Sequence, residues 1–439
     1  METKYVDVLL VNAPSAYKLP PNSRRDHIGI GCLAAVLRAQ GISVHLLDTP
    51  ILDWEVERTL EYLRPFSPKI VGISALQAQS EGAAGIVKGL RGRGFEGPIV
   101  LGGQFPTFCY DRLLVDFPEI TAIIRGEGEV SFLELVRRML EGKSWEDCPG
   151  VAYRKNGETV ANPLPPLIEP LDSLPFPARD TLPQMLAMGA IVSVGSSRGC
   201  PAKCSFCSIH NFYRLAKGPI WRARSTESVL EEVRQLVKEY GLKRFNFVDD
   251  NFLGGGEKSR RRAREFAEAM IRENLGVDFS FSCRVNDVEE ELFTLLKRAG
   301  LSAICVGIES GNQRQLDTYN KGVTVEENKQ AIRTLRKVGV EPGIGFIMAD
   351  PYLTPGELVE NMNFLKEVGV KLSDLSFPLG ELWLFDGADI LERLRAEGRV
   401  RGDYMKGYSY VAANRAFQMI YRAAGKIRDR LHPPAKRTS

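Results

Sequence analysis

Residues 191–207 have the sequence IVSVGSSRGCPAKCSFC, in which a short apolar run leads into a loop with three cysteines. The run Ile191–Gly195 is a strand candidate. Cys200, Cys204 and Cys207 follow it with the spacing C-x3-C-x2-C, and no fourth cysteine is nearby. Loops at the carboxyl ends of strands carry the chemistry of many α/β folds. This stretch therefore predicts a functional loop at the start of an α/β domain.

A regular alternation of strand and helix patterns continues from this loop. Helical segments such as Ser228–Tyr240 and Val325–Val338 lie between the strand candidates. Six βα units with right-handed crossovers predict an open, partial (β/α)6 barrel over residues 186–385. Its strand candidates are Ile191–Gly195, Arg244–Val248, Phe279–Cys283, Ala303–Ile308, Gly343–Met348 and Leu372–Phe377.

The first 145 residues show the same rhythm and predict a separate domain. Short apolar runs alternate with amphipathic stretches such as Gly31–Ala39 and Val130–Leu140, which is typical of a doubly wound parallel sheet of the Rossmann type. Glycines follow several of the strands, where they permit close approach of a ligand or only form tight turns. The strand candidates are Val6–Val11, Val44–Leu47, Ile70–Ile73, Ile99–Leu101 and Ala122–Ile124.

Two further segments complete the predicted organisation. Residues 146–185 contain a hairpin signal at Asn156–Gly157 and then seven prolines, which excludes a helix or a central strand and predicts an ordered linker. Residues 386–439 are expected to form a short, mostly helical C-terminal region.

The three clustered cysteines favour an iron–sulfur cluster over a structural zinc site. Iron–sulfur cubanes take four thiolates, so three cysteines leave one iron open to a substrate or cofactor. A zinc site would need a fourth ligand, which His210 could supply. The other five cysteines are scattered and give no disulfide framework.

The composition and net charge of the chain exclude few classes of protein. The chain of 439 residues is 44% hydrophobic and 26% charged, as expected for a globular protein of two or three domains. A net charge of +3 gives no case for a nucleic-acid partner. We find neither a membrane-span pattern nor a signal peptide, and expect a cytoplasmic protein.

The cysteine loop, with Phe206 before its last cysteine, resembles the signature of the radical S-adenosylmethionine (SAM) superfamily. Further segments resemble the same family: Arg222–Ser225, Phe247–Phe252 and Gly307–Gly311. The resemblance implies a [4Fe–4S] cluster held by the three cysteines, whose open iron binds SAM and cleaves it to a 5′-deoxyadenosyl radical. It also implies that Glu309 contacts the ribose of SAM, that Arg284 or Arg224 contacts its carboxylate, and that Phe206 lies at the cofactor.

The N-terminal half resembles the cobalamin-binding branch of this superfamily. The segments that carry this resemblance are Gly29–Arg38, Leu101–Thr107, Arg125–Glu129 and Leu171–Arg179. By it, Ser74 and Leu76 with Gly102 and Gly103 would make room for the nucleotide tail of cobalamin. A D-x-H-x-x-G motif with a cobalt-ligating histidine is absent, and His27 is interpreted as a loop or cap residue. Gln104 and Phe105 also depart from the residues that relatives carry.

These resemblances imply three alternative functions. The first is a cobalamin-dependent methyltransferase acting on an unreactive carbon or phosphorus centre. The second is a dehydratase, cyclase or epimerase with a vestigial cobalamin domain, and the third is a non-enzymatic corrinoid or iron–sulfur sensor or carrier. An enzyme would need a small-molecule or peptide substrate and a reducing electron donor such as flavodoxin or ferredoxin. Candidates for holding a polar substrate or moving protons are Asp249, Asp250, Asp350 and Tyr352.

Overall fold

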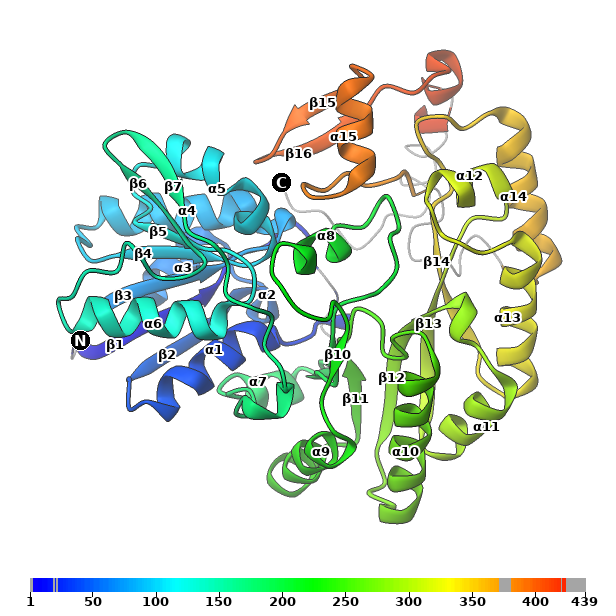
Figure 1. Ribbon diagram of the computed structural model, residues 1–439, viewed down its shortest axis with the longest axis horizontal. Helices are drawn as coiled ribbons and strands as arrows, with labels where there is room; N and C mark the ends of the chain where they lie inside the picture. Colours follow the sequence, from blue (N-terminus) through cyan, green and yellow to red (C-terminus); the bar gives the residue numbers. More distant parts are fainter. Residues whose placement is uncertain (1–2, 19, 21–22, 371–379, 420, 424–439) are drawn as a thin grey trace.

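The computed structural model describes residues 3–18, 20, 23–370, 380–419 and 421–423, which form two large sheets and a smaller C-terminal unit. Figure 1 shows the N-terminal sheet (blue to cyan) on one side and the second sheet (green to yellow) on the other. The C-terminal elements (orange) lie beside both. The predicted α/β class, a doubly wound sheet followed by a partial barrel, is confirmed.

The N-terminal sheet has the strand order β2-β1-β3-β4-β5-β6-β7, and its first five strands are parallel. The order reverses between β1 and β3, and ligands of doubly wound sheets bind at such a switch point. The parallel strands are β1 (Lys4–Asn12), β2 (Val44–Asp48), β3 (Phe66–Ser74), β4 (Ile99–Gly102) and β5 (Ala122–Ile124).

Alternate residues of β1 pack into separate cores on the two faces of this sheet. Leu9 and Val11 pack with helices α3, α4 and α5, whereas Val8 and Leu10 pack with α1 and α6. The helices on the two faces are α1 (Ile28–Ala39), α3 (Val56–Leu63), α4 (Ser80–Gly92), α5 (Gln104–Asp116) and α6 (Gly128–Leu140). The sequence pattern does not predict α3 or the short α2 (Thr49–Leu52).

The hairpin predicted around Asn156–Gly157 extends this sheet. Its strands are β6 (Val151–Lys155) and β7 (Glu158–Ala161), and β6 pairs antiparallel with β5. Asn156 and Gly157 both have positive φ, which is the conformation that a two-residue type I′ turn needs. The proline-rich stretch that follows leads to α7 (Leu182–Ala187) and into the second sheet.

The second sheet is entirely parallel, with the order β14-β13-β12-β11-β8. Its strands are β8 (Val192–Val194), β11 (Arg244–Phe247), β12 (Asp278–Arg284), β13 (Leu301–Glu309) and β14 (Pro342–Phe346). The larger helices flanking it in Figure 1 are α9 (Thr226–Tyr240), α10 (Glu257–Glu273), α11 (Glu290–Arg298), α13 (Val325–Lys337) and α14 (Pro355–Glu367). The sixth strand predicted over Leu372–Phe377 lies outside the described residues.

The C-terminal unit requires one correction to the predicted helical region. Besides α15 (Asp389–Ala396) it contains a β-hairpin of β15 (Val400–Asp403) and β16 (Gly407–Tyr410). This hairpin contacts the N-terminal domain, because Tyr404 Oη donates a hydrogen bond to Asp116 and Ser80 Oγ donates one to the Met405 carbonyl. Among the described residues, no helix is both long and apolar enough to cross a membrane.

Candidate functional site

The three cysteines lie in one loop between the two-residue strand β9 (Ser197–Arg198) and α8 (Ile209–Arg214). All three are free thiols and only partly buried. Burial raises the pKa of Cys200, and it raises the pKa of Cys207 to about 12. These thiols therefore need nearby positive charge, such as that of bound iron, to ionise near neutral pH.

The loop suits a multi-iron cluster better than a single ion. In the part of the chain that the structure describes, no three His, Cys, Asp or Glu side chains converge as ligands of one ion would. Zinc requires such convergence, whereas each thiolate of a cubane binds a different iron. His210, the fourth ligand of the zinc alternative, is buried on α8 without a hydrogen-bond partner for either ring nitrogen.

Backbone contacts fix the shape of the cysteine loop. Gly199 has φ +84°, and a Cβ there would lie 1.9 Å from the Ile220 carbonyl oxygen, so only glycine fits. Its N–H donates to Asp250 Oδ2 at 2.9 Å. On the far side of the loop, Ser205 N–H donates to the Tyr319 carbonyl at 2.8 Å.

Two predicted SAM contacts lie at adjacent strand ends beside this loop. Arg284 ends β12, and its Nη1 lies 3.2 Å from Cys204 Sγ. Glu309 ends β13 with φ +64°, a conformation that residues other than glycine seldom adopt and that is common at functional sites. Lys321 Nζ, which is buried, donates to Glu309 Oε1 at 2.9 Å.

The other two predicted contacts, Arg224 and Phe206, are also held by protein partners. The guanidinium of Arg224 donates to Glu232, Ser228 and the Gly195 carbonyl. Phe206 packs edge-on against Tyr319, with ring centroids 5.6 Å apart, and against the apolar cluster of the C-terminal unit.

A cavity of about 390 Å³ opens at the switch point of the N-terminal sheet and extends to the barrel. The four residues that the resemblance assigns to cobalamin, Ser74, Leu76, Gly102 and Gly103, all line it. The barrel contributes Arg198, Tyr213, Val248 and Asp250, among others. The cavity therefore lies between the N-terminal sheet and the residues next to the cysteine loop.

The shape of this cavity depends on positions that lack a side chain. A Cβ on Gly72 would lie 2.7 Å from Leu10 Cδ2, and one on Gly103, where φ is +102°, would lie 2.7 Å from the Ala75 carbonyl oxygen. Leu76, an apolar residue, is 45% exposed at the wall. A large group with apolar surface would fit this cavity, as expected for the nucleotide tail of cobalamin.

His27 caps α1, as interpreted from the sequence. Its Nδ1 accepts a hydrogen bond from the Ile30 N–H at 3.2 Å, and its ring lines the cavity. Because Nδ1 is the acceptor, the proton of the neutral ring lies on Nε2. This hydrogen bond gives His27 a structural role at the start of α1.

The neighbouring acids Asp249 and Asp250 occupy different environments. Asp249 is buried and accepts hydrogen bonds from Ser196 N–H at 2.8 Å and Ser197 Oγ at 2.8 Å. Asp250 is exposed to solvent at the cavity wall, and desolvation by the neighbouring protein raises its pKa to about 6. Asp250 can therefore carry or release a proton in the cavity near neutral pH.

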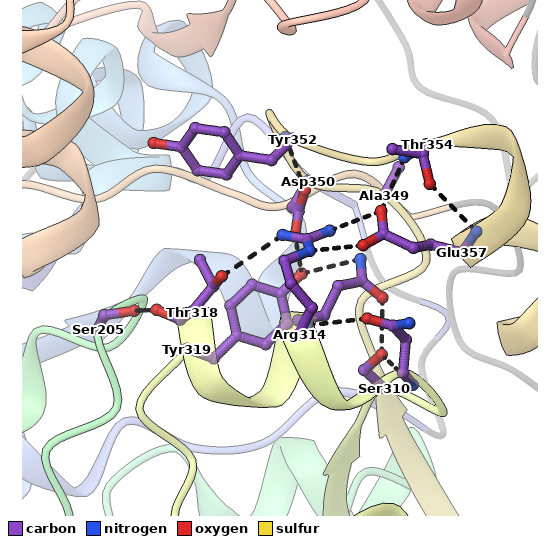
Figure 2. A network of polar contacts seen from close by, with 12 residues as sticks. Ser205, Ser310, Arg314, Thr318, Tyr319, Ala349, Asp350, Tyr352, Thr354 and Glu357 are labelled. Atoms are coloured by element: carbon purple, nitrogen blue, oxygen red, sulfur yellow. Dashed lines mark hydrogen bonds and ion pairs between the residues drawn. The ribbon is translucent and has the colours of Figure 1, made fainter.

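Asp350 and Tyr352 belong to a polar network outside the residues that line the cavity (Figure 2). Asp350 accepts hydrogen bonds from Arg314 at 3.1 Å, Tyr319 Oη at 3.3 Å and Tyr352 N–H at 2.7 Å. Tyr352 Oη donates to Glu397 of the C-terminal unit at 2.7 Å. The structure thus places these two residues together but separates them from Asp250.

Sequence reasoning misses several residues that contact the predicted site. Lys321, the partner of Glu309, lies in a turn with no recognisable pattern. Gln104 stands out in the sequence only as a departure from relatives, yet its Nε2 donates to Ser208 Oγ, directly after Cys207, at 2.7 Å. Glu127 and Glu129 stand out only as part of a family-like segment, and they pair with Arg198 just before the cysteines.

Family comparisons agree with this two-part architecture. Residues 194–365 match the radical SAM superfamily, and residues 23–136 match the B12 binding domain. The chain is 31% identical to an uncharacterized methyltransferase of Pyrococcus horikoshii over 87% of this chain and 83% of that protein. It is 32% identical to the anaerobic magnesium-protoporphyrin IX monomethyl ester cyclase of Rubrivivax gelatinosus, over 73% of this chain and 58% of the cyclase.

Solved structures show the same fold. The cobalamin-dependent SAM radical enzyme OxsB superposes with a TM-score of 0.83 at 21% identity, over 97% of this chain and 67% of OxsB. The radical SAM methyltransferase TsrM of Kitasatospora setae gives a TM-score of 0.72 at 21% identity, over 90% of this chain and 76% of TsrM.

The identity to the Pyrococcus horikoshii protein extends over most of both chains, and the matched regions coincide with the barrel and the N-terminal sheet. The cofactors that accompany these two domains are a [4Fe–4S] cluster, SAM and cobalamin. The chain belongs to the radical SAM superfamily of enzymes and carries a B12-binding domain in front of its barrel.

Proposed function

We propose that this enzyme is a cobalamin-dependent methyltransferase that acts on an unreactive carbon or phosphorus centre of a biosynthetic intermediate. The observation that supports it best is the shared cavity. Gly102 and Gly103 of the N-terminal domain line the same space as Arg198 and Asp250, which lie beside the cysteine loop. Chemistry at both cofactors can then occur on one enclosed substrate.

The chain's residues divide between the two cofactors in this proposal. Cys200, Cys204 and Cys207 hold the cluster, Arg284 contacts the SAM carboxylate and Glu309 its ribose hydroxyls. We prefer Arg284 to Arg224, since Arg284 Nη1 lies 3.2 Å from Cys204 Sγ. When bound, the cluster and SAM supply a radical that abstracts hydrogen, and cobalamin supplies the methyl group.

The cavity walls have the roles of orienting and shielding. Ser74, Leu76, Gly102 and Gly103 make room for cobalamin, while the apolar walls exclude water from reactive species. Asp250 holds or accepts a proton of the substrate at its carboxylate oxygens. The assignments of Asp249, Asp350 and Tyr352 stay predictions; their hydrogen bonds support a role in fixing the loops around the site.

A second candidate is a radical reaction without methyl transfer, such as cyclisation, dehydration or epimerisation. Its support is the 32% identity to a protein named as a cyclase. The domain boundaries that we propose for either function are 1–145, 146–185, 186–385 and 386–439, with the hairpin of the second segment completing the N-terminal sheet.

The two candidates differ in their nucleoside products. Anaerobically reconstituted protein that methylates should bind one corrinoid per chain and form both S-adenosylhomocysteine and 5′-deoxyadenosine, measured by mass spectrometry. Formation of 5′-deoxyadenosine alone, with or without added corrinoid, would replace the first candidate by the second.

A further inference from the structure

Residues of the N-terminal domain bind the cysteine loop on both sides of its three cysteines. Arg198, two residues before Cys200, donates to Glu127 at 2.9 Å and to Glu129 at 2.5 Å. Ser208, directly after Cys207, accepts a hydrogen bond from Gln104 Nε2 at 2.7 Å. The loop is therefore held at both ends by residues from the other domain.

The three residues that bind the loop, Gln104, Glu127 and Glu129, follow the carboxyl ends of two neighbouring strands. Gln104 begins α5 just after β4, and Glu127 and Glu129 follow β5 at the start of α6. β4 and β5 pair in parallel, so their ends lie side by side. One edge of the N-terminal sheet thus presents all three side chains to the barrel.

Burial makes the ion pairs of this contact costly to break. The side chains of Glu127 and Glu129 are each 7% exposed, and Arg222, which donates to Glu127 at 2.8 Å, is 1% exposed. Two carboxylates face two guanidinium groups, so the charges balance. A buried pair that loses one partner leaves an uncompensated charge, which is costly.

The same side chains form part of the cavity wall. Gln104, Glu127, Glu129 and Arg198 all line the cavity that contains Gly102 and Gly103. A group bound in this cavity would therefore touch the residues that hold the cysteine loop.

We infer that Gln104, Glu127 and Glu129 are positioning residues that couple occupancy of the cobalamin cavity to the geometry of the iron–sulfur loop. Binding at either site then stabilises the arrangement of side chains that the other site requires. Such coupling is reciprocal: the cluster must raise cobalamin affinity by the same factor by which cobalamin raises cluster affinity. The inference rests on the two cofactors of the family and holds whether or not methyl transfer follows.

The first test compares hydroxocobalamin affinity in protein with the cluster and in protein from which iron has been removed. We expect the dissociation constant of the wild-type chain to differ by about fivefold or more between the two forms, the lower end of typical coupling between sites. In Glu127→Gln this ratio should fall to near one, because the amide keeps the shape but loses the charge that holds Arg198 and Arg222. Glu273→Gln is the matched control, since Glu273 pairs with Arg234 at 2.8 Å on the outer helices.

A second pair of variants tests the other end of the loop. Gln104→Met and Ser208→Ala each remove one hydrogen bond without changing any charge, so they cover the case in which Glu127→Gln fails to fold. Each should reduce the affinity ratio, and the double variant should reduce it no further than either single one.

A spectroscopic measurement provides an independent readout. Cobalamin should change the electron paramagnetic resonance spectrum of the reduced cluster in wild-type and Glu273→Gln protein, and this change should be smaller in Glu127→Gln and Gln104→Met. Equal cobalamin affinities in the two wild-type forms would overturn the inference. So would a ratio and a spectral change that survive intact in the folded variants at both ends.

Discussion

The cysteine loop and the cavity of the N-terminal domain are built on opposite principles. The loop presents three thiol side chains that suit iron. The cavity is lined by residues without side chains, Gly72, Gly102 and Gly103, together with polar residues of both domains such as Glu127 and Arg198. The cluster site should therefore be lost when one cysteine is removed, whereas the cavity should lose its ligand when a larger side chain fills it. The predictions below test this contrast.

The largest effect is expected from Cys200→Ala. Loss of one of only three thiolates should remove the cluster and abolish SAM cleavage, because no spare cysteine lies in the loop. Iron content and 5′-deoxyadenosine formation measure this. Cobalamin should still bind, although less tightly if the coupling inferred above holds. A variant with full iron content would refute the assignment of Cys200.

Filling the cavity should weaken cobalamin binding and leave the cluster in place. In Gly102→Val the new side chain has room in the protein, since a Cβ there lies 3.7 Å from its nearest neighbours, but it projects where the cofactor would lie. We expect cobalamin affinity to fall at least about tenfold, which corresponds to about 1.4 kcal/mol, with iron content unchanged. Absorbance titration gives the affinity. Gly92→Val serves as the control, because Gly92 lies on α4 and a Cβ added there would have no neighbour within 4 Å.

Glu309 tests whether the strand end beside the cluster binds SAM. Glu309→Ala should weaken SAM binding by at least about tenfold, since a hydrogen bond to a charged group contributes about 1.5–3 kcal/mol. Equilibrium binding with the cluster intact measures this. Lys321→Met keeps the carboxylate and should weaken binding less; an equal loss in both variants would assign the effect to the ion pair instead.

The smallest effect on catalysis is expected at Asp350. Asp350→Asn weakens a buried contact with Arg314 and should lower the free energy of unfolding by about 1–3 kcal/mol, measured in urea. Arg314 keeps Glu357 at 2.6 Å, so the network is not lost entirely. Iron content and both cofactor affinities should not change. A variant of normal stability that cannot turn over would instead show that Asp350 acts in the reaction.

Features set by residues close together in the sequence were predictable, whereas contacts between residues far apart in the sequence were not. The strand pattern and the turn at Asn156–Gly157 are local signals, and the structure contains the turn and every predicted strand except that over Leu372–Phe377, which lies outside the described residues. The bond from Gln104 to Ser208 joins residues 104 apart, and nothing in either segment indicates the other. The same holds for the ion pairs of Arg198 with Glu127 and Glu129.

The C-terminal hairpin shows where local patterns are insufficient. The sequence predicts helix where the hairpin β15–β16 forms, and the hairpin's contacts with Asp116 and Ser80 show that distant packing accompanies this strand structure. The placement of Phe206 at the cofactor stays a prediction of the family resemblance; in the structure its ring packs on Tyr319 and the C-terminal apolar cluster.

The placement of β6 and β7 at the edge of the N-terminal sheet has a consequence for biosynthesis. All seven strands of that sheet have been translated once residue 161 emerges from the ribosome, so this domain can fold while the barrel is still being made. The far wall of the cavity, from Gly195 to Asp250, is translated later. The two sides of the cavity wall are therefore synthesised in order along the chain, and the site is complete only once Asp250 has been translated.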